Sequence, residues 1–321
     1  DRHLLPGADF QGTGKYGVYL FFVLSAFLLT RPLVGAQAEL GSAASWGRYA
    51  LRRALRIFPL YWVVLATNWF FTEVAPTQAF PTLSTERWVQ HMWLREGKGL
   101  YWAVPVELTY YLVIPVYAGF VRLVRGDLRL VAAGTAALLV ASSLAFPPGE
   151  TPRNSLNLGY YLPVFALGSF AAVVERQLPR GTAAGYDALA ALGLAVALAL
   201  FPSVVEAATG RDVDKSFLHT SYVGFGLVWS AVGVGLVRGR TRLVRWVSHP
   251  FLRLVGVVSF SVYLWHVPIL RALVMLELPS PFATAWLTVA VSLAAAMLSY
   301  LAIEKPFVHG ALAPRWLRKR R

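Results

Sequence analysis

Nine long apolar blocks, separated by short polar stretches, constrain this chain more than any other feature. Most blocks reach the roughly 20 residues that an α-helix needs to cross the ~30 Å hydrocarbon layer of a membrane. We therefore predict an all-α integral membrane protein, a helical bundle of about nine spans. The blocks are residues 16–34, 57–74, 101–121, 130–147, 158–174, 186–205, 217–237, 254–276 and 281–303.

The composition excludes an ordinary soluble domain. Of the 321 residues, 57% are hydrophobic and 14% are charged, whereas soluble domains have roughly 45–50% apolar and about 25% charged residues. The excess of 30 Lys and Arg over 16 Asp and Glu does not indicate nucleic-acid binding, because the arginines fall between apolar blocks, where they orient helices. The chain has no cysteine, which excludes disulfides, thiol nucleophiles and cysteine-ligated metals. We predict no metal site and no permanently bound cofactor.

The cationic residues concentrate in alternate loops, and this pattern predicts the orientation. The positive-inside rule places the cation-rich loops in the cytoplasm, so the C-terminus is expected inside and Asp1 outside. An outside start without a cleaved signal usually follows another helix, so we expect one further span upstream and ten in the intact protein. The longest loops hold about 20–25 residues, too few for a folded domain, so residues 1–321 are predicted to form a single transmembrane domain.

Two arginines at the inner end of the second block are candidates for donor binding. Arg53 and Arg56 are three residues apart and therefore share a helix face. Guanidinium groups suit bidentate contacts to phosphate, and Tyr61 and Trp62 add a possible stacking surface. The alternative is that both arginines are ordinary positive-inside anchors.

Two ionisable residues are predicted at membrane depth, where such groups are expensive and so mark functional candidates. Glu107 could bind an acceptor or handle a proton, and the alternative is a structural hydrogen bond to a neighbouring helix. His266 could act as a general base near neutral pH, and the alternative is a buried, merely hydrogen-bonded histidine. Near the inner end of the last block, Glu304 could pair with a cytosolic arginine. In the first block, small Ser25 and Ala26 favour close helix packing.

Taken in order, these segments resemble the membrane acyltransferase-3 family. The family typically shows G-V-D-L-F-F-V-L-S-G-F-L, R-R-x-x-R-I-x-P-x-Y-W, W-S-L-x-x-E-x-x-F-Y-L-x-x-P, S-Y-x-x-Y-L-x-H-x-P and E-x-P. The corresponding segments here are residues 17–30, 52–62, 101–115, 259–268 and 303–306. The chain departs from the family at Tyr19, where Asp is common, at Ala26, where Gly is usual, and at Ala103, where the usual Ser after Trp102 is missing.

The resemblance implies ten helices and a membrane-bound O-acyltransferase of the bacterial plasma membrane. The donor would be acetyl-CoA or another acyl-CoA, and the acceptor a hydroxyl on a carbohydrate or a lipid-linked glycan. Membrane lipid would surround the helices. The family carries a catalytic histidine near its first motif, and His3 is the histidine of this chain that precedes that motif. We therefore expect His3 or an upstream counterpart, together with Glu107 and His266, to be catalytic, and Arg53, Arg56 and Tyr61 to bind the donor.

Two other classes of function stay open from the residues alone. A proton-coupled transporter or flippase would also combine many helices with buried Glu and His, but it predicts an inverted repeat between halves, and none is obvious in the sequence. A non-catalytic scaffold would explain the helices but not the motifs. Transfer of acetyl from labelled acetyl-CoA, as against uptake without modification, distinguishes these alternatives.

Overall fold

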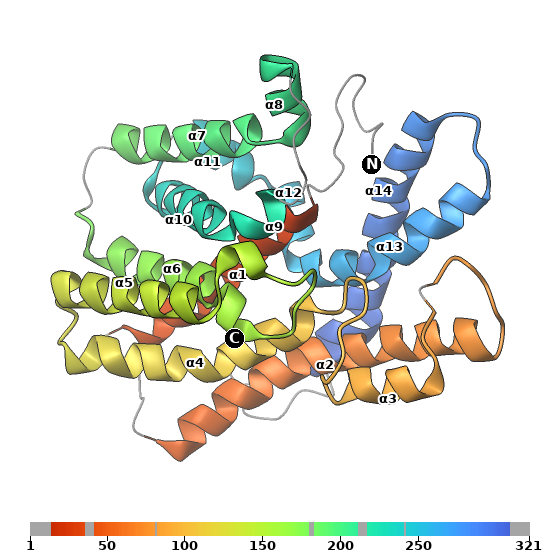
Figure 1. The fold of residues 1–321 in the computed structure, drawn as a ribbon, viewed down its shortest axis with the longest axis horizontal. Coiled ribbons are helices and arrows are strands. Elements are labelled where there is room, and N and C mark those ends of the chain that lie inside the picture. The colour runs from red at the N-terminus through yellow and green to blue at the C-terminus, as the bar shows by residue number, and fades with distance from the viewer. Residues whose placement is uncertain are drawn as a thin grey trace. The chain divides into compact units, whose positions relative to one another are not determined.

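The computed structural model describes residues 14–35, 42–80, 82–179, 183–210, 217–240 and 242–308. The chain divides into two compact units. Unit 1 comprises residues 1–40 and 103–249, and unit 2 comprises residues 41–102 and 250–321. All regular elements of the described residues are helical (Figure 1), which confirms the predicted all-α class.

Unit 1 packs around helix α6. This helix contacts α1, α4, α5 and α10, and α10 also packs against α7; α5 and α6 run side by side in Figure 1. The helices of unit 1 are α1 (Gly14–Leu33), α4 (Ala103–Leu123), α5 (Leu128–Ala145), the short turn η1 (Pro148–Glu150), α6 (Leu158–Gln177), α7 (Ala183–Ala199), α8 (Pro202–Thr209), α9 (Phe217–Thr220), α10 (Tyr222–Arg238) and α11 (Arg242–Val247).

The contact between α1 and α6 is close because small residues face each other. A Cβ added to Gly168 would lie 2.4 Å from the carbonyl oxygen of Val23 and 2.9 Å from the Cβ of Ala26. The predicted packing role of Ala26 is confirmed, since a larger side chain there would push the helices apart. Next to this contact, Phe22 stacks on Phe165 with ring centroids 4.3 Å apart.

Unit 2 combines one long helix with a helical hairpin. Helix α2 contacts α3, α13 and the π-helical turn η2, while α13 and α14 pack against each other as the blue hairpin of Figure 1. The helices are α2 (Ala43–Glu73), α3 (Thr85–Met92), α12 (Pro250–Val257), α13 (Ser259–Met275), α14 (Pro281–Ser299), η2 (Tyr300–Glu304) and α15 (Lys305–Val308).

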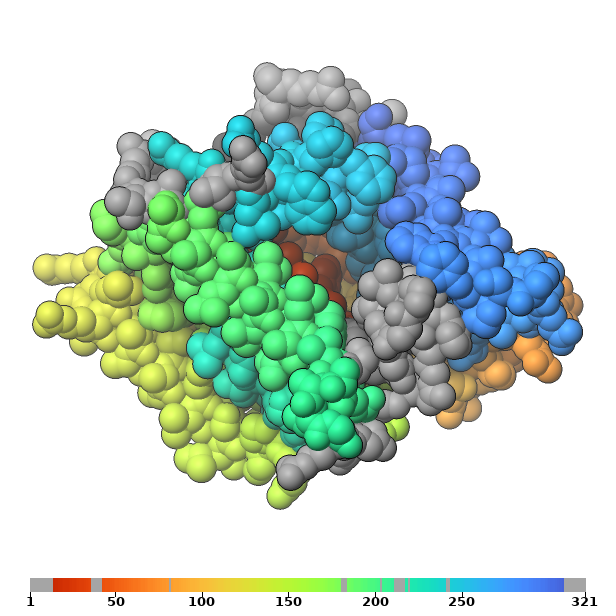
Figure 2. Space-filling model, turned by 90° about the horizontal axis from the view of Figure 1, so that it is seen from above, coloured from red at the N-terminus to blue at the C-terminus, as the bar shows by residue number. Residues whose placement is uncertain are grey.

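The helices account for each of the nine apolar blocks. Six described helices are long and apolar enough to cross a membrane, the bent pair α12 and α13 adds a seventh, and two shorter apolar helices lie at 184–199 and 222–238. Large apolar side chains are exposed on these helices, including Leu112 (75%) and Leu144 (77%). In Figure 2, α7 and α8 form a green surface strip of unit 1, where Leu192 is 64% exposed. Such surfaces suit lipid, so the chain is a multi-pass membrane protein.

Three blocks depart from a single straight span. The sixth breaks before Pro202, which begins α8, because proline is tolerated in the first turn of a helix but not in its interior. The seventh is interrupted at Ser221, between α9 and α10. The eighth bends by 74° between Val257 and Ser259. The second block is extended instead, since α2 begins at Ala43, and Arg53 and Arg56 lie on this helix as predicted.

Candidate functional site

Three of the resembling motifs meet at one carboxylate in unit 2. Glu304 has no exposed surface, and its Oε2 lies 3.2 Å from the Nη1 of Arg56. Ser261 donates its hydroxyl proton to Oε1 of the same carboxylate. The predicted ion pair between Glu304 and a rim arginine is therefore confirmed. The pair connects the arginine motif on α2 with the serine of α13 and the end of η2.

The two candidate donor-binding arginines have different surroundings. Arg56 is engaged by Glu304 and also donates from Nη2 to the carbonyl oxygen of Val257, at 2.9 Å. Arg53 is half-buried, and its Nε is buried without a partner. Among the described residues, nothing forms a hydrogen bond or ion pair with the Arg53 side chain. Arg53 thus retains its donors for a ligand, whereas Arg56 is largely committed to the fold.

His266 is half-buried on α13, and its hydrogen bonds define its tautomer. Its Nδ1 lies 2.7 Å from the carbonyl oxygen of Tyr263 and 3.2 Å from that of Val262. Because a carbonyl only accepts, the proton of the neutral ring is placed on Nδ1. Nε2 then carries the lone pair, and no described residue hydrogen-bonds to it. This arrangement suits a general base.

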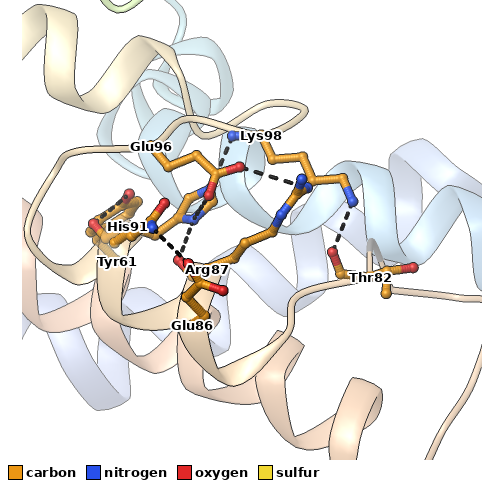
Figure 3. A network of polar contacts seen from close by, with 8 residues as sticks. Tyr61, Thr82, Glu86, Arg87, His91, Glu96 and Lys98 are labelled. Carbon is orange, nitrogen blue, oxygen red and sulfur yellow. Dashed lines mark hydrogen bonds and ion pairs between the residues drawn. The ribbon is translucent and has the colours of Figure 1, made fainter.

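Tyr61 and His91 are the buried members of a polar network (Figure 3). The Tyr61 side chain is fully buried, and its hydroxyl donates to the carbonyl oxygen of His91 at 3.3 Å. Its ring contacts that of Tyr101 edge to face, with centroids 6.1 Å apart. The neighbouring Trp62 is 44% exposed, so Trp62 presents the accessible aromatic surface at this point of α2.

His91 itself is buried and fully hydrogen-bonded. Its Nδ1 donates to the carbonyl oxygen of Arg87 at 2.7 Å, and its Nε2 accepts from the backbone N–H of Lys98 at 2.9 Å. Burial lowers the pKa of His91 below its ordinary value, although the Arg87 carbonyl and the nearby Glu96 carboxylate act in the opposite direction. Sequence reasoning missed this residue because it lies between two apolar blocks, on the short helix α3.

In unit 1, the first and third motifs meet at Glu107. This residue is 2% exposed, and Ser25 of α1 and Tyr111 of α4 both donate hydroxyl protons to its Oε1. The hydrogen bond between helices that was the structural alternative for Glu107 is therefore present. Ser25, expected to serve packing, contributes this polar contact as well.

A second carboxylate cluster in unit 1 was missed by sequence reasoning. Glu175 of α6 is 3% exposed and pairs with Arg31 of α1 at 2.9 Å and with Arg238 of α10 at 3.0 Å. The pairing connects three helices of the unit. In the sequence, all three residues lie at the ends of apolar blocks on the cation-rich side. Their spacing does not indicate that they pair with one another.

The structure thus distributes the predicted residues over the two units. Unit 1 holds Glu107, and unit 2 holds Arg53, Arg56, Tyr61 and His266. His3 lies outside the described residues. In each unit, polar side chains from different motifs meet between packed helices whose outer surfaces are apolar. Membrane proteins retain functional polar groups in this way. The fold and these clusters together define a multi-span membrane protein with ionisable side chains buried between its helices.

The comparison with known families then gives the class of activity. Residues 3–304 match the family described as acyltransferase domain. The chain belongs to this acyltransferase family, which its motifs resemble, and the predicted class of membrane-bound O-acyltransferase is confirmed.

Two curated relatives align with most of the chain. Over 330 residues the chain is 24% identical to "Peptidoglycan O-acetyltransferase OatA" of Listeria monocytogenes serovar 1/2a, covering 91% of this chain and 51% of that protein. Over 315 residues it is 25% identical to "Putative membrane-bound transacylase BcsY" of Komagataeibacter xylinus, covering 91% of this chain and 76% of that protein. The chain therefore spans about half the length of the Listeria relative. No solved structure matches it.

Proposed function

We propose that this protein transfers an acetyl group from acetyl-CoA to a sugar hydroxyl of a cell-envelope glycan, at the bacterial plasma membrane. The observation that carries the proposal is the family match over residues 3–304. The relative named for peptidoglycan O-acetylation supports a glycan acceptor, and the relative named a transacylase supports acyl transfer at a membrane.

The donor is assigned to the arginine motif of unit 2. Acetyl-CoA carries phosphate groups, for which guanidinium is the best-suited side chain. Arg53 supports this role because its guanidinium is not engaged by the described residues. Arg56 and Tyr61 then act chiefly by holding α2 in place, through Glu304 and through His91.

The chemistry needs a base and a path for the proton. In the proposed reaction, a histidine removes the proton of the acceptor hydroxyl, and the oxygen attacks the thioester carbonyl. The C–S bond breaks, and the CoA thiolate leaves and is protonated by the histidinium. His266 supports this role through its open Nε2, and His3 is the second candidate. Glu107 is the candidate of unit 1 for binding the sugar acceptor.

The proposal is tested with membranes containing the full-length protein, radiolabelled acetyl-CoA and peptidoglycan or a sugar-polymer acceptor. We expect label to enter the acceptor, and His266→Ala to lower kcat by about a hundredfold or more, which is the usual contribution of a positioned base. Thr288→Ala, on α14, is the control for expression and insertion. Uptake of an unmodified substrate without transfer would support a carrier and contradict the proposal.

A further inference from the structure

A cationic cavity lies in unit 1 where three spanning helices end. It has a volume of about 430 Å³, which is within the range of small-ligand sites. It opens beside the C-terminal ends of α1, α4 and α6. Its lining includes Val121, Arg122, Arg125, Val173, Arg176 and Gln177.

The lining is apolar on one side and cationic on the other. Val121 and Val173 are 4% and 2% exposed and belong to the packed core of the unit. Arg122, Arg125 and Arg176 are exposed side chains. No lining residue is acidic, so the cavity combines an apolar base with three guanidinium groups.

One of these arginines hydrogen-bonds to the end of a neighbouring helix. Arg176 donates from Nη1 to the carbonyl oxygen of Arg31 at 3.2 Å, which satisfies an exposed carbonyl of α1. Gln177 donates to the carbonyl oxygen of Gly126 at 2.7 Å and fixes the turn after α4.

Two carboxylates adjoin the lining in sequence, and both are engaged elsewhere. Glu175 is paired with two other arginines, and Asp127 caps α5 by accepting from the backbone N–H groups of Arg129 and Leu130. The cavity therefore keeps an excess of positive charge.

Arg125 is the residue that the fold explains least. Among the described residues, no hydrogen bond or ion pair engages its side chain. Its backbone has φ 55°, in the left-handed region, next to Gly126 with φ 71°. The backbone N–H groups of Arg125 and Gly126 close the end of α4 by bonding to the carbonyls of Arg122 and Val121. Glycine suits such a position best, so the turn itself does not require arginine.

We propose that this cavity binds the phosphate headgroup of an anionic phospholipid. Basic pockets between spanning helices on the cytoplasmic side are suited to anionic headgroups. Arg122 and Arg176 lie in the last turns of α4 and α6, and Arg125 follows α4, at the cation-rich end that the positive-inside rule places in the cytoplasm.

The guanidinium groups of Arg125 and Arg176 contact the phosphate. The apolar lining, which includes the half-buried Val34 beside Val121 and Val173, faces the glycerol end of the lipid. A soluble phosphate ligand would leave that apolar base unoccupied, so the lining favours a lipid.

The experiment uses the full-length protein purified in detergent and stripped of lipid. Native mass spectrometry counts the lipids retained after titration with phosphatidylglycerol or phosphatidylcholine, and a thermal unfolding assay follows the same titrations. We expect tighter retention of phosphatidylglycerol and a higher Tm with it. Arg125→Gly should weaken retention about fivefold, the effect expected for one arginine near an anionic headgroup.

Arg125→Gly separates binding from folding. Glycine suits the left-handed backbone at this position, so this variant should keep the Tm of the parent protein in phosphatidylcholine. Arg176→Gln, combined with Arg125→Gly, should lower retention further. Arg129→Gln is the matched control, because Arg129 is exposed on the first turn of α5 but does not line the cavity, and it should retain the lipid like the parent.

Three results would overturn the assignment. Equal retention of phosphatidylglycerol and phosphatidylcholine would mean that the cavity does not read the headgroup charge. Unchanged retention in Arg125→Gly would place the lipid elsewhere. The third result is that millimolar inorganic phosphate or free CoA displaces phosphatidylglycerol from the parent protein but not from Arg125→Gly. That result would assign the cavity to a soluble phosphate ligand.

Discussion

Glu175 in unit 1 and Glu304 in unit 2 are both buried carboxylates near the ends of spanning helices, but their partners differ. Glu175 is paired with two arginines, Arg31 and Arg238, which come from two other helices. Glu304 is paired with a single arginine, Arg56, and accepts a hydrogen bond from Ser261. The first carboxylate has a spare cation, whereas the second has none among the described residues.

The difference separates a structural ion cluster from one tied to the motifs. Both partners of Glu304 belong to the segments that resemble the acyltransferase family, 52–62 and 259–268, while Arg31 and Arg238 lie outside those segments. Burial and pairing alone would rank the two clusters equally. We infer that the cluster of Glu175 secures α1 and α10 against α6, and that the cluster of Glu304 holds α2 so that Arg53 stays available.

The largest expected effect is on stability when Arg56 is removed. Arg56→Ala would leave the Glu304 carboxylate buried without a cation, and breaking a buried pair by removing one partner costs roughly 3–5 kcal/mol. Because the Arg56 side chain is 30% exposed, we expect about 3 kcal/mol, at the lower end of that range. Thermal unfolding in detergent would show a clear fall in Tm.

The double variant Arg56→Ala, Glu304→Gln is the internal control. Removing the carboxylate charge together with the arginine should recover most of the lost stability, since a neutral amide is less costly to bury than a charge. A double variant as unstable as Arg56→Ala alone would show that the arginine acts through packing rather than through the ion pair.

The second prediction concerns the cluster with the spare cation. Arg238→Ala leaves Glu175 paired with Arg31, so we expect a loss of about 1–2 kcal/mol, less than for Arg56→Ala. The same unfolding assay measures it. Equal losses in the two single variants would contradict the claim that the clusters differ in redundancy.

Local patterns in the sequence predicted the helices well and the contacts between them less well. Hydrophobic length located helices at each of the nine blocks, and six of the described helices are long and apolar enough to span a membrane. The bend after Val257 was not predicted, since no proline lies at that point of the chain. Local signals of this kind do not report how neighbouring segments redirect a helix.

In the candidate site, too, local patterns predicted individual residues better than the contacts between distant segments. The pairing of Glu304 with a rim arginine could be anticipated because both ends carry motif residues, and it is present. The cluster of Glu175 and the buried His91 could not, since their partners come from segments distant in sequence or from a loop without periodicity. The roles of Glu107 and His266 in the reaction stay predictions that activity measurements must test.

The third prediction uses Arg53, the arginine that the fold leaves available. Arg53→Ala should raise the KM for acetyl-CoA about tenfold, corresponding to about 1.4 kcal/mol for one charge-assisted contact, with little change in Tm. Arg48→Ala is the control, because the Arg48 guanidinium donates to Ser45 on the same helix. A fall in Tm with an unchanged KM would make Arg53 a structural residue like Arg56 and remove the contrast between them.

The smallest expected effect is the pH dependence that His91 gives to unit 2. Burial lowers the pKa of this histidine below its ordinary value of 6.5, so the folded state favours the neutral ring. The stabilisation is complete above that value and is lost as the pH falls, because the unfolded chain then binds a proton that the folded chain excludes. Between pH 7.5 and 5.5 we expect a loss on the order of 1 kcal/mol.

The groups that face His91 determine how this test is controlled. Protonation would break the bond from the Lys98 N–H, and the cations of Arg87 and Lys98 oppose it while the Glu96 carboxylate favours it. His91→Gln should remove this part of the pH dependence of Tm, whereas His249→Gln, in unit 1, should leave it intact. If both variants kept the slope of the parent protein, the slope would belong to groups other than these two histidines, and the contrast between the units would lie in their ion pairs alone.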